Sequence, residues 1–251
     1  MTDFELVRAE NPGPFTLSGT NSWLIGRDPA FLIDPGPALP EHLDALERAI
    51  VDRGGLGAMI LTHDHADHAE AVRPLRRRIE APLAAARGQV DVLLTDGEAI
   101  GPFTVVASPG HAPDHIALVT GGMCFSGDAV LGEGSVFIAP APGSMSGYLR
   151  ALRRLRVLDL DTIHPGHGPL VEDPRAKLDE YIAHRLEREQ ALRRALDDGL
   201  RGSAELLDRV WADAVPALRP AAAVTLEAHL GKLEEEGALP AGVERVDFSW
   251  L

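Results

Sequence analysis

The chain has 251 residues, of which 45% are hydrophobic and 25% charged, a composition typical of a globular protein. Its formal net charge of -14 disfavours a dedicated nucleic-acid binder, because such a surface repels phosphate backbones at long range. No apolar run approaches the ~18 residues that a membrane span needs, and no secretory signal is visible at the N-terminus. The single cysteine, Cys124, excludes an internal disulfide, so we expect a cytoplasmic protein without membrane association.

The part of the chain before residue 172 alternates short apolar runs with helical patterns. Amphipathic helices are predicted at 40–55, 69–80 and 146–160, the second interrupted near Pro74. Strands that alternate with helices indicate a layered α/β architecture. The apolar runs of strand length lie at 22–26, 30–36, 58–62, 103–108, 115–120, 123–127 and 161–166.

The pattern changes after residue 173, where three helices are predicted at 173–199, 203–215 and 220–239. Asp173 is a plausible N-cap of the first of these helices, with Pro174 at its first position. Residues 243–251 alternate like a terminal strand. Three helices and a small β element indicate a winged-helix-like module. We therefore predict a catalytic domain at 1–173 and a C-terminal helical, winged-helix-like domain at 174–251.

The stretch "THDHADH" crowds titratable side chains directly after the predicted strand at 58–62. His63 and His65 lie two residues apart and can converge in an extended loop, whereas Asp67 and His68 lie where a helix would begin. Imidazole nitrogens and carboxylate oxygens are ligands that zinc prefers. One histidine alone would more often be an ordinary surface residue, but this density favours a metal site.

Three further polar residues repeat the same context. His111, Asp128 and His167 each follow a predicted strand, in a turn that contains glycine and lets the backbone approach closely. The recurrence predicts that these side chains meet the histidine cluster at one edge of the sheet structure.

Together, "THDHADH", "SPGHAPDH", "FSGD" and "HPGHGP", with "GTNSWLIG" and "LIDPG" upstream, resemble the metallo-beta-lactamase superfamily over most of residues 18–170. The resemblance implies an αββα metallo-beta-lactamase sandwich with a metal site at its edge. It also implies two zinc ions per chain, with iron or manganese as alternatives. The implied ligands are His63, His65 and His111 for one metal, Asp67, His68 and His167 for the second, and Asp128 as the bridge between them.

The C-terminal helices resemble the beta-lactamase-like protein 2 subgroup, which adds a winged-helix-type domain. That subgroup includes a single-strand-specific endoribonuclease, and related enzymes act on polyketide-type thioesters. The resemblance therefore leaves more than one substrate class open.

Two zinc ions about 3.5–4 Å apart can share a hydroxide that attacks at ordinary pH. We expect Asp128 and Asp67 to be the catalytic carboxylates, the first between the metals and the second holding the hydroxide. The favoured function is a metal-dependent hydrolase of a small or medium ester or thioester, with an acyl substrate rather than RNA as partner. A single-strand-specific endoribonuclease and a mononuclear iron oxygenase on the same fold are the alternatives. A homodimer is left open.

Several neighbours have roles that the sequence leaves less defined. The resemblance implies that Asp34 supports the metal loops by hydrogen bonding. His115 either orients a substrate or His111, or packs as a buried polar group, and His164 is expected to be structural. The Gly-rich segment 131–149 follows Asp128 and is expected to shape the substrate pocket.

Overall fold

The computed structural model describes residues 3–248, which form two compact units. The first unit comprises the chain up to Ser108, Asp114–Ser135 and Leu158–Pro174. The second comprises Pro109–Pro113, Val136–Val157 and the chain from Arg175 onward. Two segments that precede residue 173 thus group with the C-terminal helices, and the domain boundary between residues 173 and 174 stays a prediction.

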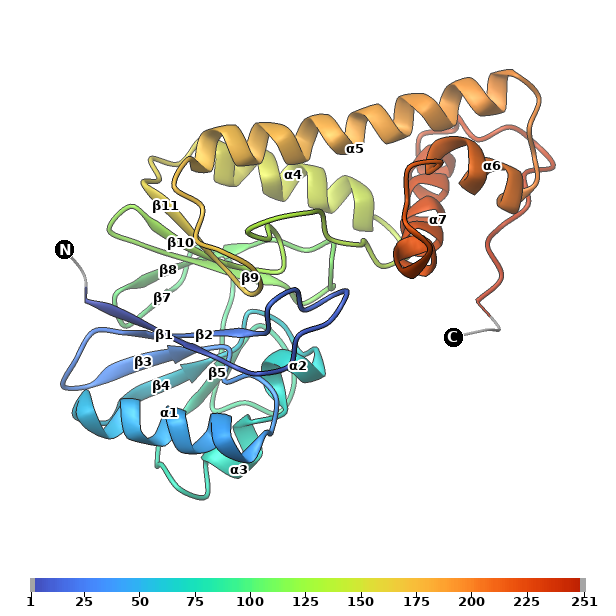
Figure 1. The fold of residues 1–251 in the computed structure, drawn as a ribbon. Coiled ribbons are helices and arrows are strands. Elements are labelled where there is room, and N and C mark those ends of the chain that lie inside the picture. Colours follow the sequence, from blue (N-terminus) through green and yellow to red (C-terminus); the bar gives the residue numbers. More distant parts are fainter. Residues whose placement is uncertain (1–2, 249–251) are drawn as a thin grey trace. The chain divides into compact units, whose positions relative to one another are not determined.

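The first unit contains two β-sheets (Figure 1). The strands β3, β4, β5 and β6 run parallel to one another, as do β10 and β11, and the other neighbours are antiparallel. The first sheet has the order β1 (Phe4–Arg8), β2 (Asn21–Ile25), β3 (Ala30–Ile33), β4 (Leu56–Ile60), β5 (Leu83–Ala85), β6 (Val92–Leu93). The second has the order β11 (Thr162–Pro165), β10 (Met123–Gly127), β9 (Ile116–Thr120), β8 (Phe103–Ala107), β7 (Ala99–Ile100).

Successive side chains of the central strands enter two different cores, because side chains alternate between the faces of a sheet. Ile33 and Ile60 face the second sheet, where they pack with Phe103 and Phe125. Their neighbours face the helices α1 (Pro40–Asp52) and α3 (Val72–Leu75) on the outer side of the first sheet. Because both faces of these strands are buried, their sequences are continuous apolar runs. The unit therefore consists of a helical layer, the first sheet and the second sheet.

The predicted helix at 69–80 is interrupted near Pro74, as expected, but its extent is wrong. The chain forms two short helices instead, α2 (Ala66–Ala69) and α3, and it leaves helical geometry soon after Pro74. Proline cannot donate a backbone hydrogen bond and is tolerated only near the start of a helix, where it lies in α3. The earlier start at Ala66 places Asp67 and His68 in the first turn of α2.

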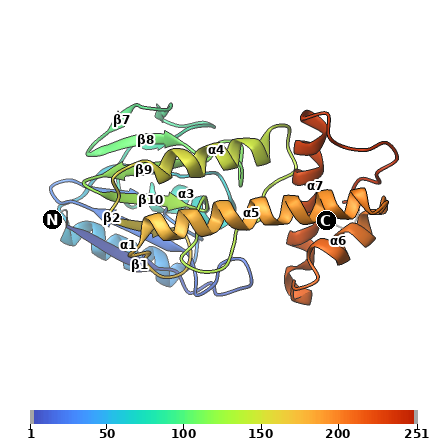
Figure 2. The ribbon, with the colours of Figure 1, turned by 90° about the horizontal axis from the view of Figure 1, so that it is seen from above.

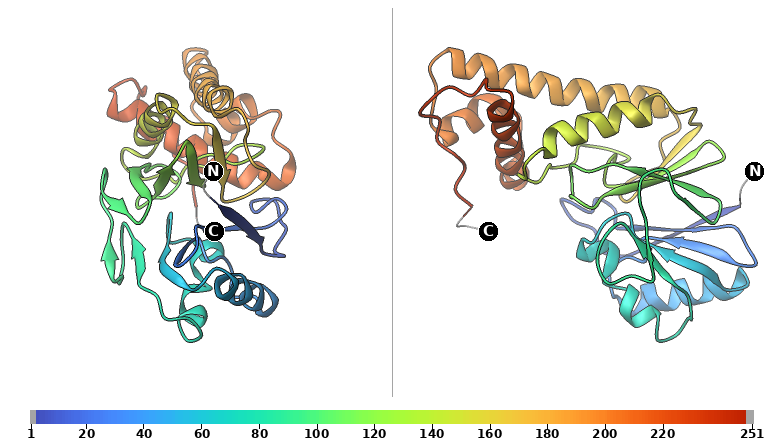
Figure 3. Two further views of the ribbon diagram at one scale, coloured as in Figure 1. Left: turned by 90° about the vertical axis from the view of Figure 1, so that its left-hand side faces the viewer. Right: turned by 180° about the vertical axis from the view of Figure 1, so that it is seen from behind.

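The second unit contains the helices α4 (Ser144–Arg156), α5 (Pro174–Asp197), α6 (Ser203–Val210) and α7 (Arg219–Glu235), with a 3-10 turn at Pro216–Leu218. Figure 2 shows α4 beside the first part of α5, where Arg156 binds Asp179 through two hydrogen bonds of 2.7 and 2.9 Å. Figure 3 shows α6 and α7 near the other end of α5. These three helices share an apolar core that includes Leu192, Leu206 and Leu226.

The predicted strand at 243–251 is absent over 243–248, and residues 249–251 lie outside the described part of the chain. A strand needs a partner strand, and here the backbone donors bind elsewhere: Glu244 N donates to Arg201 O at 2.8 Å, and Val246 N to Glu227 Oε2 at 3.0 Å. Val243 and Val246 pack against the apolar core of α5, α6 and α7. The alternation therefore reflects docking onto helices.

Among residues 3–248, none of the helices combines the length and hydropathy required to cross a bilayer. Cys124 lies fully buried in β10, as expected for a core thiol, and burial raises its pKa to about 12.

His164 on β11 is structural, as predicted. Its ring lies 4.6–4.7 Å, between centroids, from the rings of Phe4, Trp23 and Phe125. Burial in these aromatic surroundings disfavours the imidazolium and lowers the pKa of His164 to about 4. The folded protein therefore keeps this histidine neutral at pH values where the unfolded chain protonates it.

We expect this histidine to weaken the fold in acid. Between pH 6.5 and 4 the unfolded state binds the extra proton, so stability is full above this window and falls as the pH drops through it. The loss attributable to His164 reaches at most about 3 kcal/mol at pH 4, from about 1.4 kcal/mol per pKa unit. Urea unfolding of wild type and His164→Gln across this range measures it, since other groups are common to both. Equal pH dependence in the two proteins would contradict the expectation.

Candidate metal centre

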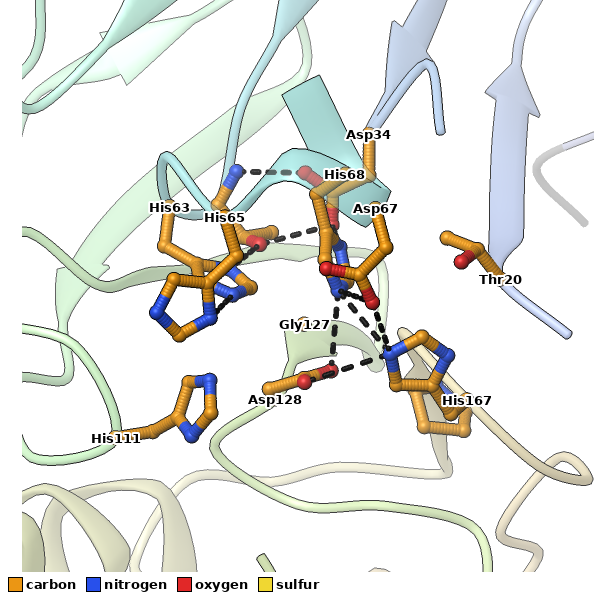
Figure 4. A network of polar contacts seen from close by, with 12 residues as sticks. Thr20, Asp34, His63, His65, Asp67, His68, His111, Gly127, Asp128 and His167 are labelled. Atoms are coloured by element: carbon orange, nitrogen blue, oxygen red, sulfur yellow. Dashed lines mark hydrogen bonds and ion pairs between the residues drawn. The ribbon is translucent and has the colours of Figure 1, made fainter. Parts of the chain in front are cut away.

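Six of the seven predicted ligands come together within the first unit (Figure 4). They lie after the ends of β4, β10 and β11, which meet at one edge of the two sheets. His63 and His65 lie in the loop after β4, and α2 adds two more ligands. The other members of the group are Asp67, His68, Asp128 and His167.

Nδ1 of His65 lies 3.0 Å from Nε2 of His63, and the donor atoms of the other five ligands form two overlapping groups. His63, His68 and Asp128 make one group, and Asp67, His68 and His167 make the other; within each, the donor atoms all lie within 4.8 Å of one another. His68 belongs to both groups. Asp128 lies between the two imidazoles, with its carboxylate oxygens 3.5 Å from Nε2 of His68 and 3.5 Å from Nε2 of His167. A carboxylate between two imidazoles can bind one metal ion or bridge two, so the donor set fits a metal ion.

Asp34 orients histidines of both groups through one carboxylate. Its Oδ2 accepts a hydrogen bond from His68 Nδ1 at 2.9 Å and another from the Thr62 hydroxyl at 2.8 Å. Since the Thr62 hydrogen is used in this bond, Thr62 Oγ1 accepts from Nδ1 of His63 at 3.0 Å. In the neutral form of each imidazole the lone pair is therefore on Nε2, the atom that faces the site and that a metal ligand needs.

The backbone of Asp34 lies in the left-handed region, with φ of 51°. A side chain other than glycine is strained there and persists only where surrounding contacts fix it. Three hydrogen bonds fix Asp34, because Oδ1 also accepts from Thr62 N at 2.8 Å. The predicted supporting role of Asp34 is thus visible in its contacts, whereas the relay through Thr62 was not predicted. The position of Thr62 directly before His63 was the sequence feature that could have indicated this relay.

His167 shows that the site is built for positive charge. Its Nδ1 donates to Gly19 O at 3.2 Å, so its Nε2 carries a lone pair. That atom lies 3.2 Å from Nε2 of His68, which also carries a lone pair. Two lone pairs at this distance repel each other unless a proton or a metal ion accepts them, so the donor set fits a metal ion.

The pKa shifts agree with this reading. Burial disfavours protonation of His68 and His167, but the Asp128 carboxylate outweighs it, raising the pKa of His68 well above its usual value and that of His167 to about 9. Burial also disfavours ionised Asp128, but the two imidazoles hold its pKa well below the usual value. The carboxylates therefore stabilise cationic charge within a buried cluster.

His115 positions Asp128. Its Nε2 accepts a hydrogen bond from Asp128 N at 3.0 Å, which places the ring hydrogen on Nδ1, 2.8 Å from Ser108 Oγ. The sequence left open whether His115 orients a substrate or His111 or packs as a buried polar group, and its contact with the backbone of Asp128 was not predicted. Gly166 contributes by its size: a Cβ there would lie 2.5 Å from Asp128 Oδ1. Sequence reasoning missed Gly166, although it lies in the "HPGHGP" motif.

His111 belongs to the second unit, within Pro109–Pro113. Both ends of this short segment are tethered to the first unit, because Ser108 N donates to His115 O at 2.9 Å and closes the loop. With at most about 3.6 Å of chain per residue, the Cα of His111 lies within about 11 Å of that of Ser108. Its role as a ligand stays a prediction.

Comparisons with known proteins identify the family. A model of the Metallo-beta-lactamase superfamily matches residues 15–101 and 89–167, and one of the Beta-lactamase associated winged helix domain matches 203–250. The chain therefore belongs to the metallo-beta-lactamase superfamily, whose members are mostly hydrolases, and carries the associated winged-helix domain. This confirms the predicted fold class.

Three similar proteins refine this assignment. A beta-lactamase-like protein 2 homolog from Caenorhabditis elegans is 30% identical, with 93% of this chain and 84% of the relative covered. An atrochrysone carboxyl ACP thioesterase from Aspergillus novofumigatus is also 30% identical, with 93% and 79% covered. A solved metallo-beta-lactamase family protein from Thermus thermophilus is 25% identical, with a TM-score of 0.73 and 94% of each chain covered.

Asp34→Asn tests the supporting carboxylate. Asparagine tolerates the left-handed backbone, but its amide group places hydrogens against donors that need an acceptor. We expect metal affinity to fall about 10- to 100-fold, the usual cost of losing a partner of a ligand. Competition with a chromophoric chelator measures this. Asp64→Asn is the matched control, because Asp64 is exposed between two ligands; equal affinity in all three proteins would remove Asp34 from this role.

Proposed function

We propose that the protein is a dinuclear zinc hydrolase that cleaves an acyl ester or thioester of small or medium size. The observation that carries the proposal is the pair of overlapping donor groups that share His68 and flank Asp128. Histidine and carboxylate donors without sulfur suit zinc, and they also accept iron or manganese. Two such ions would supply a nucleophilic hydroxide near neutral pH and a Lewis acid for the substrate oxygen.

The exposure of the two carboxylates divides their roles. The Asp128 side chain is 9% exposed and lies deep between two imidazoles, so it serves to hold positive charge in place. The Asp67 side chain is 32% exposed, and its Oδ2 lies 3.1 Å from Nε2 of His167. Asp67 can therefore accept a hydrogen bond from the attacking water at the open side of the site. We therefore assign to Asp67 the role of accepting the proton of the attacking water.

Two observations support an acyl substrate. The thioesterase among the relatives covers almost the whole chain, winged-helix region included. The net charge of -14 also disfavours polyanions at long range. An acyl substrate needs an apolar pocket beside the metals, and the segment 131–149 is the proposed source of it.

Cleavage of single-stranded RNA is the second candidate, favoured by the similarity to the beta-lactamase-like protein 2 subgroup and by the winged-helix domain. RNA binding needs arginines that are available to phosphates. In the second unit many arginines instead bind carboxylates, which lowers their net attraction for a polyanion. These pairs are Arg188–Asp213, Arg193–Glu236, Arg209–Asp198, Arg219–Asp208 and Arg245–Glu227.

His63→Ala tests the metal assignment. We expect the variant to lose metal and at least about 100-fold of turnover, because a zinc ion with one ligand fewer is bound weakly and its water is less acidic. Metal content by mass spectrometry and circular dichroism separate this loss from unfolding. His164→Gln is the control, a buried histidine in the same unit that should keep metal and turnover. Full turnover in His63→Ala would remove His63 from the site.

Asp128→Asn tests the reaction class. The substitution keeps the shape of the side chain and removes the charge between the two cations, so we expect hydrolysis to fall by about two orders of magnitude or more. Wild type and variant are assayed, with metal quantified, on acyl thioesters, lactones, phosphodiesters and single-stranded RNA. Turnover of thioesters or lactones that Asp128→Asn loses supports the proposal. Cleavage of RNA alone, or one iron per chain with no hydrolysis, contradicts it.

A further inference from the structure

Within the second unit, helices α5 and α7 hold the segment 136–138 from both sides. Arg185 on α5 donates a hydrogen bond through Nη2 to Val136 O. Ile138 N donates to Thr225 Oγ1 on α7 at 3.3 Å. The Thr225 hydroxyl itself donates to Ala221 O at 2.9 Å, so its oxygen can only accept from Ile138. The backbone is therefore fixed on each side of Phe137 by buried side chains of the C-terminal helices.

The residue between these two anchors contacts His111. Phe137 O accepts a hydrogen bond from His111 Nδ1 at 3.1 Å, and the two rings meet edge to face with centroids 4.9 Å apart. Since a carbonyl oxygen only accepts, Nδ1 carries the ring hydrogen and Nε2 carries the lone pair. This is the tautomer in which Nε2 can bind a metal, and a ligand histidine needs such a partner to keep its orientation.

The burial of Arg185 needs an explanation of its own. Its side chain is among the largest fully buried ones, and the guanidinium lies 5.6 Å from the centroid of the Tyr148 ring on α4. Tyr148 also packs directly against Gly110, the residue before His111. An apolar side chain would fill this space without desolvating a charge. What the guanidinium adds is a directed hydrogen bond to Val136 O.

We propose that Arg185 and Thr225 are positioning residues for the metal ligand His111. The C-terminal helices fix the segment 136–138, the segment fixes the imidazole, and metal binding at that ligand therefore depends on side chains of α5 and α7. The proposal rests on the proposed function in one respect only, namely that His111 binds metal. It does not depend on the substrate.

The test is a zinc titration of the full-length protein against a competing chromophoric chelator, without substrate. His111→Ala identifies which of the two affinities belongs to this ligand. Thr225→Val keeps the side-chain shape and removes the acceptor for Ile138 N. We expect it to weaken the same affinity about tenfold, the lower end for partners of ligands, and to leave the other unchanged. Arg185→Met should act in the same direction, and Thr225→Ser, which keeps the hydroxyl, should restore wild-type binding.

Cobalt substitution gives a second readout, because the visible spectrum of Co(II) follows the nitrogen ligands around it. Thr225→Val should shift the spectrum toward that of His111→Ala. Leu233→Ala is the matched control, since Leu233 lies in the apolar core of α5, α6 and α7 and its loss loosens these helices without removing a hydrogen bond.

Wild-type affinities and spectra in both Thr225→Val and Arg185→Met would overturn the inference. An equal loss in Leu233→Ala at the same melting temperature would also overturn it, because general loosening would then be the cause. Failure of the proposed function looks different, since the wild type would bind two metal ions and cleave no substrate in the panel.

Discussion

The candidate metal centre depends on the Asp34 carboxylate, which holds Thr62 and His68 at once. Asp34 follows β3, and the ligand loop follows β4, its parallel neighbour. Parallel pairing brings the carboxyl ends of the two strands together, so a single side chain can reach ligands of both donor groups. The left-handed backbone of Asp34 is the local cost of this reach, and the three hydrogen bonds around it offset that cost.

The environment of each histidine decides which charge state the fold favours. His167 lies between carboxylates, which raise its pKa to about 9, whereas burial among aromatic rings lowers the pKa of His164 to about 4. Burial together with the nearby Arg185 and Lys232 lowers the pKa of His229 to about 3. Identical side chains within one chain thus favour either the cationic or the neutral form. The difference lies in whether a carboxylate is within hydrogen-bonding distance.

Much of the fold and site could be predicted because each signal was local in sequence. The apolar runs before His63 and Asp128 and the cluster from His63 to His68 need no distant information. The short strands β5, β6 and β7 could not be predicted, since two or three residues carry no periodicity. The role of His115 also stayed open, because it depends on a hydrogen bond to the backbone of Asp128, 13 residues away. The prediction of a strand over 243–248 failed for a different reason. Apolar residues do alternate there, but they pack against helices and not beside a partner strand.

The only thiol of the chain lies within β10 with a pKa of about 12, in the strand that delivers Asp128. At neutral pH it is almost entirely protonated, and the thiolate is the form that oxidants and alkylating reagents attack. The donor groups contain nitrogen and oxygen only. Peroxide and iodoacetamide attack thiolates, so they have no target among these donor atoms, in contrast to zinc sites built from cysteine. The redox state of the surroundings therefore does not act directly on these ligands.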